Sequence, residues 1–313
     1  MNLEKFSKAN ISYNYDTFID YYNRMRKIAL SMFEWTGLPD SMSSRFMERV
    51  LFEDGQASVL KDTSKGIIIN TRCADNGFIN IYELPTQLNC FSVQFREDRL
   101  VYNGIMNEKL NADTQAVHVL NDWDRLPTWY TIYNFAERLA DAQKTIDINI
   151  RAQRTPILIL GSDKQKDTLN TLYAQYDGFK PVIMGDQDYL SQDSIKSVNT
   201  QAPFVADKIQ SYKKEIWNEF LTTLGVNTID MEKKERLISG ESNANNELIN
   251  FNLQNFLEPR KEACKQINEL FGLNVDVKIR SDLYNIIKQE ESTIIDVNQN
   301  GIDDSIEEGV INE

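Results

Sequence analysis

Histidine is nearly absent from this sequence, because His118 is the only one among 313 residues. Its three cysteines, Cys73, Cys90 and Cys264, are scattered without a C-x-x-C pair, and an odd count of this kind favours a reducing compartment. Histidine-based acid–base catalysis and a metal site built from several histidines are therefore excluded within one chain. In the segment AVHVLNDW, His118 is predicted to be a packed or surface residue.

Long apolar runs and the common catalytic motifs are also missing. No run approaches the ~18 apolar residues of a membrane span, and the N-terminal segment MNLEKFSKANISYNYD has no apolar stretch of signal-peptide length. The motifs G-x-x-x-x-G-K-[ST], G-x-S-x-G and H-E-x-x-H do not occur. We therefore expect no membrane association, no bound nucleotide and folding in a cytoplasm. An enzyme of unrecognised type stays open as an alternative, without positive support.

Basic residues are fewer than acidic residues in this sequence. Lysine and arginine number 34 against 47 aspartate and glutamate residues, which gives a net charge of −13. Such a chain binds nucleic acid poorly on charge alone, although it can surround DNA without adhering to it. The hydrophobic fraction of 41% is adequate for a core.

Apolar residues recur at three- and four-residue steps in four segments, which predicts four amphipathic helices. These helices are expected over residues 15–34, 128–153, 202–224 and 250–271. Gly225 is predicted to end the third helix, and Pro259 to kink the fourth near Glu258. A shorter helix is expected over residues 282–289, and the polar tract 232–247 between the last two long helices is expected to be exposed.

The rest of the chain has β-like patterns. Short strands are predicted at Gly66–Asn70, Phe78–Leu84 and Asn89–Phe95, with Asn76–Gly77 as a hairpin turn. A small mixed insert lies between the second and third long helices; its parts are the apolar run Pro156–Leu160, a short helix near Gln165–Tyr176 and the segment Pro181–Met184. The pattern predicts an α+β fold, mainly α, with an antiparallel helical pair that carries a small α/β tip.

Lys233, Lys234 and Arg236 form one candidate binding segment. Glu232 and Glu235 interleave them, so they are either a solvated charge cluster or a phosphate-contacting set. The second interpretation gains weight if a ring of subunits repeats each lysine around an axis.

The second candidate is the segment DVNQNGIDDSIE, which fits the calcium-loop pattern D-x-[DN]-x-[DN]-G-x₅-E. Its side-chain ligands would be Asp296, Asn298, Asn300, Asp304 and Glu307, with the Ile302 carbonyl at the seventh position. Asp303 stands where such loops usually carry an apolar residue, so a disordered acidic tail is the alternative. A calcium-dependent structural or adhesion protein is accordingly an alternative function.

Five blocks follow one another in an order that resembles one family. They are SMFEWTGLP (31–39), AQRTPILIL (152–160), YDGFKPVIM (176–184), the block 202–236, and EACKQINELFGLNVDVKIR (262–280). Together they resemble the upper collar protein, or head–tail connector, of phi29-type short-tailed phages, which is the portal protein of those phages. The resemblance covers roughly residues 15–285 and is clearest from residue 128 onward.

The resemblance implies a structural role rather than catalysis. Portal proteins form a closed ring of about twelve copies around a channel for double-stranded DNA. The implied partners are other copies of this chain, the major capsid and scaffolding proteins, a packaging ATPase and a lower collar or tail protein. The protein is expected in the virion after assembly in the host cytoplasm.

The same resemblance divides the chain into named parts. They are the N-terminal helix of the wing (1–47), a β-rich, SH3-like wing region (48–127), a stem helix (128–154), the clip (155–200), a second stem helix (201–225), a channel loop (226–248), C-terminal wing and crown elements (249–292) and an acidic tail (293–313). Residues expected to contact DNA in the channel are Lys208, Lys233, Lys234 and Arg236. Asn199 stands where the family has a further lysine.

Overall fold

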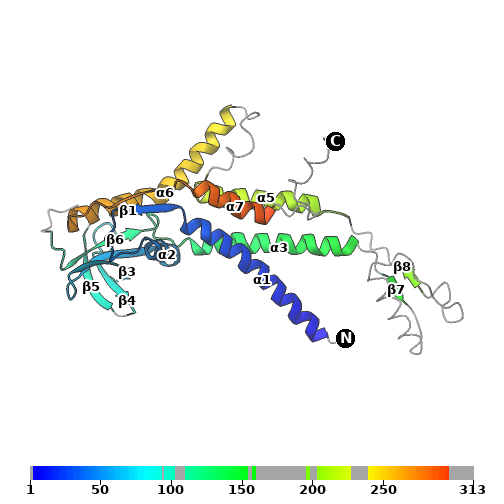
Figure 1. Cartoon of the computed structure of the whole chain (residues 1–313), viewed down its shortest axis with the longest axis horizontal. Helices are drawn as coiled ribbons and strands as arrows, with labels where there is room; N and C mark the ends of the chain where they lie inside the picture. Colours follow the sequence, from blue (N-terminus) through cyan, green and yellow to red (C-terminus); the bar gives the residue numbers. More distant parts are fainter. Residues whose placement is uncertain are drawn as a thin grey trace, which may run out of the picture. The chain divides into compact units, whose positions relative to one another are not determined.

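A computed structural model of the protein describes residues 3–93, 95–102, 110–153, 157–159, 195–197, 203–226 and 239–295 (Figure 1). The chain divides into two compact units, one made of Met1–Asp141 with Lys213–Glu313 and the other of Ala142–Tyr212. The helices are α1 (Leu3–Leu30), α2 (Ser44–Asp54), α3 (Trp129–Gln153), α5 (Ala206–Thr223), α6 (Ser239–Phe271) and α7 (Leu283–Ile295). The strands are β1 (Phe33–Thr36), β2 (Gln56–Asp62), β3 (Ile67–Asp75), β4 (Gln87–Ser92), β5 (Phe95–Tyr102), β6 (Gln115–Leu120), β7 (Ile157–Ile159), β8 (Ile195–Ser197) and β9 (Asp276–Ile279). This mixture of long helices and small sheets confirms the predicted α+β class.

Strands β2 to β6 form a closed five-stranded barrel within the first unit (Figure 1). Neighbouring strands pair antiparallel except β5 and β6, whose parallel pairing closes the barrel. Closure removes the exposed strand edges that an open sheet of this size would present. Its interior contains a buried cluster, against which the half-buried Ile69, Phe95 and Val101 also pack; the members of the cluster are Leu60, Cys73, Leu88, Cys90 and Ala116.

One predicted strand of this region, Phe78–Leu84, is wrong. Residues 78–84 form a loop between β3 and β4, with a single isolated bridge between Ile79 and Pro85. The Asn80 side-chain oxygen accepts hydrogen bonds from the backbone N–H groups of Tyr82 (2.8 Å) and Leu84 (3.1 Å). Such local bonds satisfy backbone donors that a strand would give to its neighbour, so the loop prevails despite its apolar side chains.

The first predicted helix ends earlier than its pattern indicates. Helix α1 ends at Leu30, and Phe33–Thr36 forms β1, which pairs antiparallel with β9. Phe33 and Trp35 are buried while Glu34 and Thr36 are exposed, as expected of a strand with one covered face. The partner strand lies more than 200 residues further along the chain, so no local pattern could reveal it.

Helix α2 was not predicted, and it crosses the expected boundary at residue 47. Its N-terminus is capped by Ser43, whose hydroxyl accepts a hydrogen bond from the Phe46 N–H. At its other end Gly55 adopts a positive φ of 76°, and its N–H bonds to the Leu51 carbonyl. The helix packs against β2 and β3 and buries Met47, Val50 and Leu51 in the main core.

Helix α6 is longer than predicted, because it begins at Ser239 rather than near residue 250. Pro259 lies inside it, and Figure 1 shows the helix bent between its yellow and orange parts. Proline removes one intrahelical hydrogen bond and its ring crowds the preceding turn, which accounts for a bend. The helix contacts both β6 and β9, so it joins the barrel to the two-stranded β1–β9 sheet.

A buried ion pair between Arg260 of α6 and Glu48 of α2 lies at the centre of the first unit. The two side chains are 2% and 5% exposed, and the guanidinium holds the carboxylate with two hydrogen bonds of 3.0 and 2.9 Å. The other three Arg260 N–H groups donate to Asn121 Oδ1, to the Asn121 carbonyl and to the Phe256 carbonyl, at 2.8–3.0 Å. All five donors of this arginine are therefore satisfied.

Neighbouring groups complete this network. The Trp35 indole N–H donates to Glu48 at 2.7 Å, and the Arg260 guanidinium lies 4.4 Å from the centre of the Phe33 ring. The Asn121 amide donates to the Leu126 carbonyl and to the Thr128 hydroxyl. One ion pair thus ties together α2, β1, α6 and the connection that leads into α3.

The first and last described helices are also joined by charge. Glu290 of α7 is nearly buried and receives the Lys27 ammonium of α1, with the Arg24 guanidinium 3.6 Å away. Among the described residues, none of the helices combines the length and the apolar character that crossing a membrane requires.

Candidate nucleic-acid interface

Helices α3 and α5 form the antiparallel pair that the sequence predicts. Within the first unit the Phe135 and Phe220 rings meet edge to face at 6.0 Å, and Arg138 donates to Glu219 at 2.8 Å. Apolar residues at three- and four-residue steps supply the buried sides, which include Ile132, Leu139, Trp217 and Leu221. Burial of these faces, rather than the single exposed ion pair, holds the helices together.

The second unit has its own link between the two helices. The Asn149 side chain donates to the Pro203 carbonyl (2.9 Å) and accepts from the Val205 N–H (3.0 Å). One amide thereby joins the last turns of α3 to the residues that precede α5. Strands β7 and β8 pair antiparallel, with Ile157 opposite Ser197. The short helix predicted near 165–176 and the segment 181–184 lie outside the described residues.

Charges of both signs lie on α3 and α5. Among the side chains that the structure describes, the exposed acids are Glu137, Asp141, Asp207, Glu215 and Glu219, the exposed lysines are Lys144, Lys208 and Lys214, and Arg138 is partly exposed beside Glu219. Lys208 is in the first turn of α5, directly after Asp207. A phosphate chain near these helices would therefore meet a surface of mixed charge, on which positive side chains lie between acids.

The other three predicted DNA contacts, Lys233, Lys234 and Arg236, lie outside the described residues, as do all the predicted calcium ligands. Their roles stay predictions. Lys208 is consequently the only predicted site residue within the part of the chain that the structure describes.

Sequence reasoning missed one cation of α5. Lys213 is only 2% exposed, and its ammonium lies 5.5 Å from the centre of the Tyr21 ring of α1. An aromatic face attracts a cation within about 6 Å, so the lysine joins α5 to α1. The only available signal was its position next to Ile216 and Trp217 on the apolar side of the helical pattern, because lysines are usually solvated.

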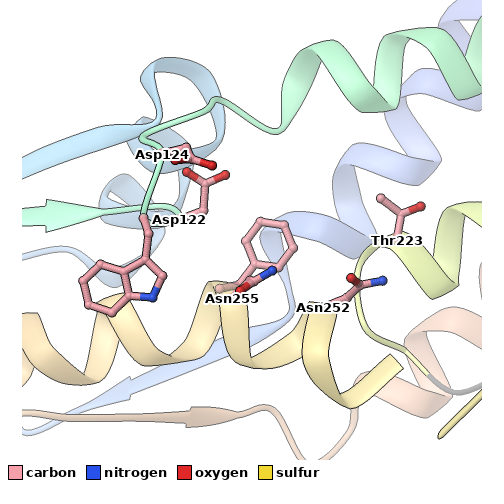
Figure 2. A pocket seen from close by; sticks show the side chains of 7 residues that line it. Asp122, Asp124, Thr223, Asn252 and Asn255 are labelled. Atoms are coloured by element: carbon pink, nitrogen blue, oxygen red, sulfur yellow. The ribbon is translucent and has the colours of Figure 1, made fainter. Parts of the chain in front are cut away.

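A pocket of about 180 Å³ lies where α5 ends beside α6 (Figure 2). Figure 2 shows Asp122 and Asp124 on the connection between β6 and α3, Asn252 and Asn255 on α6, and Thr223 at the end of α5; Trp123 and Phe256 also line it. The Asn252 amide donates to the Thr222 carbonyl at 2.8 Å, and Asp122 accepts from the Leu126 N–H at 2.8 Å. These polar groups close a helix end and a turn, and the lining contains no nucleophile paired with a base.

The part of the chain that the structure describes contains no group of three or more histidine, cysteine, aspartate or glutamate residues that could hold a metal ion. His118 lies half-buried in β6, with its Nε2 atom 2.8 Å from Gln56 Oε1. Of the two placements predicted for it, packed or on the surface, this one is closer to the packed placement.

His118 is expected to make the barrel sensitive to acid. Burial lowers the pKa of His118 from 6.5 to about 4, while Asp75 acts in the opposite direction and Arg125 adds to the decrease. The unfolded chain binds the extra proton between these two pH values, so this contribution is complete above pH 6.5 and is lost as pH falls toward 4. We expect His118→Gln to reduce the loss of unfolding free energy across that window by up to about 3 kcal/mol. Urea unfolding at a series of pH values measures it, and equal slopes for both proteins would contradict it.

The family of this chain is shown by its similarity to known proteins. The sequence model of a family described as Phage Connector (GP10) matches residues 2–284. The chain belongs to the phage connector family. Members of this family are structural proteins, which confirms the non-enzymatic prediction and removes the unrecognised enzyme as an alternative.

Solved structures of phage portal proteins are similar to this connector. A chain of the structure described as portal and tail of native bacteriophage P68 is 13% identical, with a TM-score of 0.50 and coverage of 95% of this chain and 98% of that chain. A portal protein of the HK97 family from Corynebacterium diphtheriae is 10% identical, with a TM-score of 0.42 and coverage of 86% and 93%. At this level of identity the first match shows the fold, which confirms the predicted portal fold with its barrel and long helices.

Proposed function

We propose that this connector forms a ring of about twelve copies at one vertex of a capsid and conducts the phage genome during packaging and ejection. The single observation that carries the proposal is the match of the connector family to residues 2–284. Because portal proteins of this kind occupy the junction of head and tail, the proposed partners are other copies of the chain, double-stranded DNA, capsid and scaffolding proteins, a packaging ATPase and a lower collar or tail protein. The proposed location is the virion, after assembly in the host cytoplasm.

The net charge of the chain supports a conduit along which DNA can slide. At −13 per subunit, a ring would surround DNA with a mainly repulsive wall whose field is screened within roughly 10 Å. The described exposed charges of α3 and α5 are mixed, so the repulsion in this proposal comes from the net charge of the whole chain. We assign these helices to the stem, the barrel to the wing and the 155–200 insert to the clip, as part of the same proposal.

The assembly is tested by the mass of the purified protein. Each chain is 36.2 kDa, so mass photometry should give a particle of about twelve times that mass, and electron micrographs should show a ring with a central channel. Particles that stay monomeric at micromolar concentration and physiological salt would overturn the proposal.

Lysine rings are the proposed contacts with DNA, formed by Lys208, Lys233, Lys234 and Arg236. We expect Lys233→Ala combined with Lys234→Ala to leave ring assembly intact and to reduce retention of packaged DNA several-fold, because each ring subunit loses two phosphate contacts. The measurement compares packaged genome per particle at two salt concentrations. A matched control is Lys61→Ala with Lys65→Ala, which removes the same charge from the barrel. Equal retention in both double variants would contradict the gripping role.

The calcium loop at Asp296–Glu307 stays a separate proposal that rests on its sequence pattern alone. It would bind one calcium ion per subunit through the five predicted side chains, without a part in conducting DNA.

A further inference from the structure

Two of the three cysteines lie directly opposite each other in the barrel. Cys73 of β3 pairs with Cys90 of β4 in the antiparallel register. Side chains of directly paired residues point to the same face of a sheet, and here both point into the barrel, where Cys73 is 4% exposed and Cys90 is fully buried. No sequence pattern indicates this pairing, because sixteen residues and a mispredicted strand separate the two positions.

The hydrogen-bond pattern shows which kind of pair they form. The Asn76 N–H donates to the Gln87 carbonyl at 3.3 Å, and extending the β3–β4 register by one residue beyond the Asp75–Leu88 pair places these two residues opposite each other. Hydrogen-bonded and non-hydrogen-bonded pairs alternate along an antiparallel ladder, so three residues further along, Cys73 and Cys90 form a non-hydrogen-bonded pair. The Cα atoms of such pairs are about 4.5 Å apart, which lies within the ~4.4–6.8 Å range that disulfides span.

The two thiols also share one neighbour. Both interact with the Ser58 side chain of β2, which itself lies 2.8 Å from the Thr71 hydroxyl. A single hydroxyl can contact both sulfur atoms only when they converge on the same point of the interior. The strand register, the type of strand pair and this shared contact therefore all place the two sulfur atoms close together.

We propose that Cys73 and Cys90 are a dithiol pair that closes to a cross-strand disulfide when the protein meets an oxidant, with no change in the barrel backbone. With a small disulfide such as oxidised glutathione, one thiolate attacks a sulfur of the oxidant and releases one glutathione. The second cysteine then attacks the mixed disulfide, forms the Cys73–Cys90 bond and releases the other glutathione. The protein loses two electrons and two protons, and the oxidant is reduced to two thiols.

The environment sets the rate of this reaction. Burial raises the pKa of both thiols, which lowers the fraction of reactive thiolate, so closure is expected to be slow in the folded barrel. The pair would stay reduced in a cytoplasm and close in particles that persist in oxidising surroundings. The bond would fix the ends of the segment that contains the exposed 78–84 loop.

Thiol counting after oxidation tests the proposal. The folded protein is incubated with diamide or with oxidised glutathione, unfolded, alkylated and weighed intact. The reduced protein has three free cysteines, and we expect one to remain after oxidation, so a single alkyl group should be added. Without alkylation, the oxidised protein should weigh two hydrogens less than the reduced protein. Peptide mapping should recover a linked peptide that contains both Cys73 and Cys90, and the thermal midpoint should rise by several degrees on oxidation.

Cysteine variants provide the controls. Cys264 is buried in α6, where burial raises its pKa to about 12, so Cys264→Ala should still lose two thiols on oxidation. Cys73→Ala and Cys90→Ala should lose none. Three thiols left in the oxidised wild-type protein, a stable glutathione adduct, or a disulfide between two copies of the chain would each overturn the proposal.

Discussion

Arg260→Ala is expected to lower the free energy of unfolding by about 3–5 kcal/mol, because it leaves the Glu48 carboxylate buried without its partner. The substitution also removes the donors to Asn121 and to the Phe256 carbonyl, both in the same buried space. Four elements meet at this ion pair, so the loss should affect the whole first unit. Urea unfolding of the variant and the wild type at one protein concentration gives the difference, since oligomer formation makes stability concentration-dependent.

Three further variants separate the ion pair from simple loss of a side chain. Arg260→Lys keeps the charge but loses the planar fork, so we expect a cost that approaches that of Arg260→Ala. Arg260→Met combined with Glu48→Leu removes both charges and should destabilise less than Arg260→Ala alone. Arg280→Ala breaks an exposed pair with Asp282 and should cost at most about 1 kcal/mol. A cost of Arg260→Ala that equals the cost of Arg280→Ala would contradict the central role of the pair.

The long helices were predictable because their apolar residues repeat over many turns. The prediction of 128–153 matches α3 within one residue, and α5 ends just before Gly225 as expected. The same reasoning failed where a short segment has a distant partner. Phe33–Thr36 continues an apolar pattern from α1, and only pairing with β9 makes it a strand.

The buried charged residues of the core could not be predicted from the sequence. A lysine, arginine or glutamate in a sequence predicts a solvated side chain, yet Arg260, Glu48 and Lys213 are buried. Their partners come from elements far apart in the chain, and periodicity carries no information about such partners. The cysteine pair escaped notice for the same reason, since its register depends on which strands pair.

The predicted DNA contacts came from family resemblance and only weakly from chemistry, and they stay predictions. Lys208 is an exposed lysine beside an acid, and nothing in its spacing distinguishes it from Lys214. The order of long sequence blocks identified the family, whereas single residues could not.

Gly225→Ala is the second substitution with a large expected effect. Gly225 ends α5 with a positive φ of 78°, its N–H bonds to the Thr222 carbonyl, and the Val226 N–H bonds to the Leu221 carbonyl. A Cβ atom added there would lie 2.4 Å from the Leu253 backbone nitrogen and 2.5 Å from its Cα atom. Both atoms belong to the backbone of α6, so the helix itself would have to move.

Two costs therefore add at this position. The left-handed conformation alone costs a non-glycine residue roughly 1–2 kcal/mol, and displacement of α6 from the end of α5 adds to it. We expect a total of about 3 kcal/mol or more, measured by urea unfolding. Gly272→Ala is the matched control, because Gly272 ends α6 with a φ of 67° and has no atom within 4 Å of an added Cβ. The control should show the conformational cost alone, and equal losses in the two variants would mean that the contact between Gly225 and Leu253 does not constrain α6.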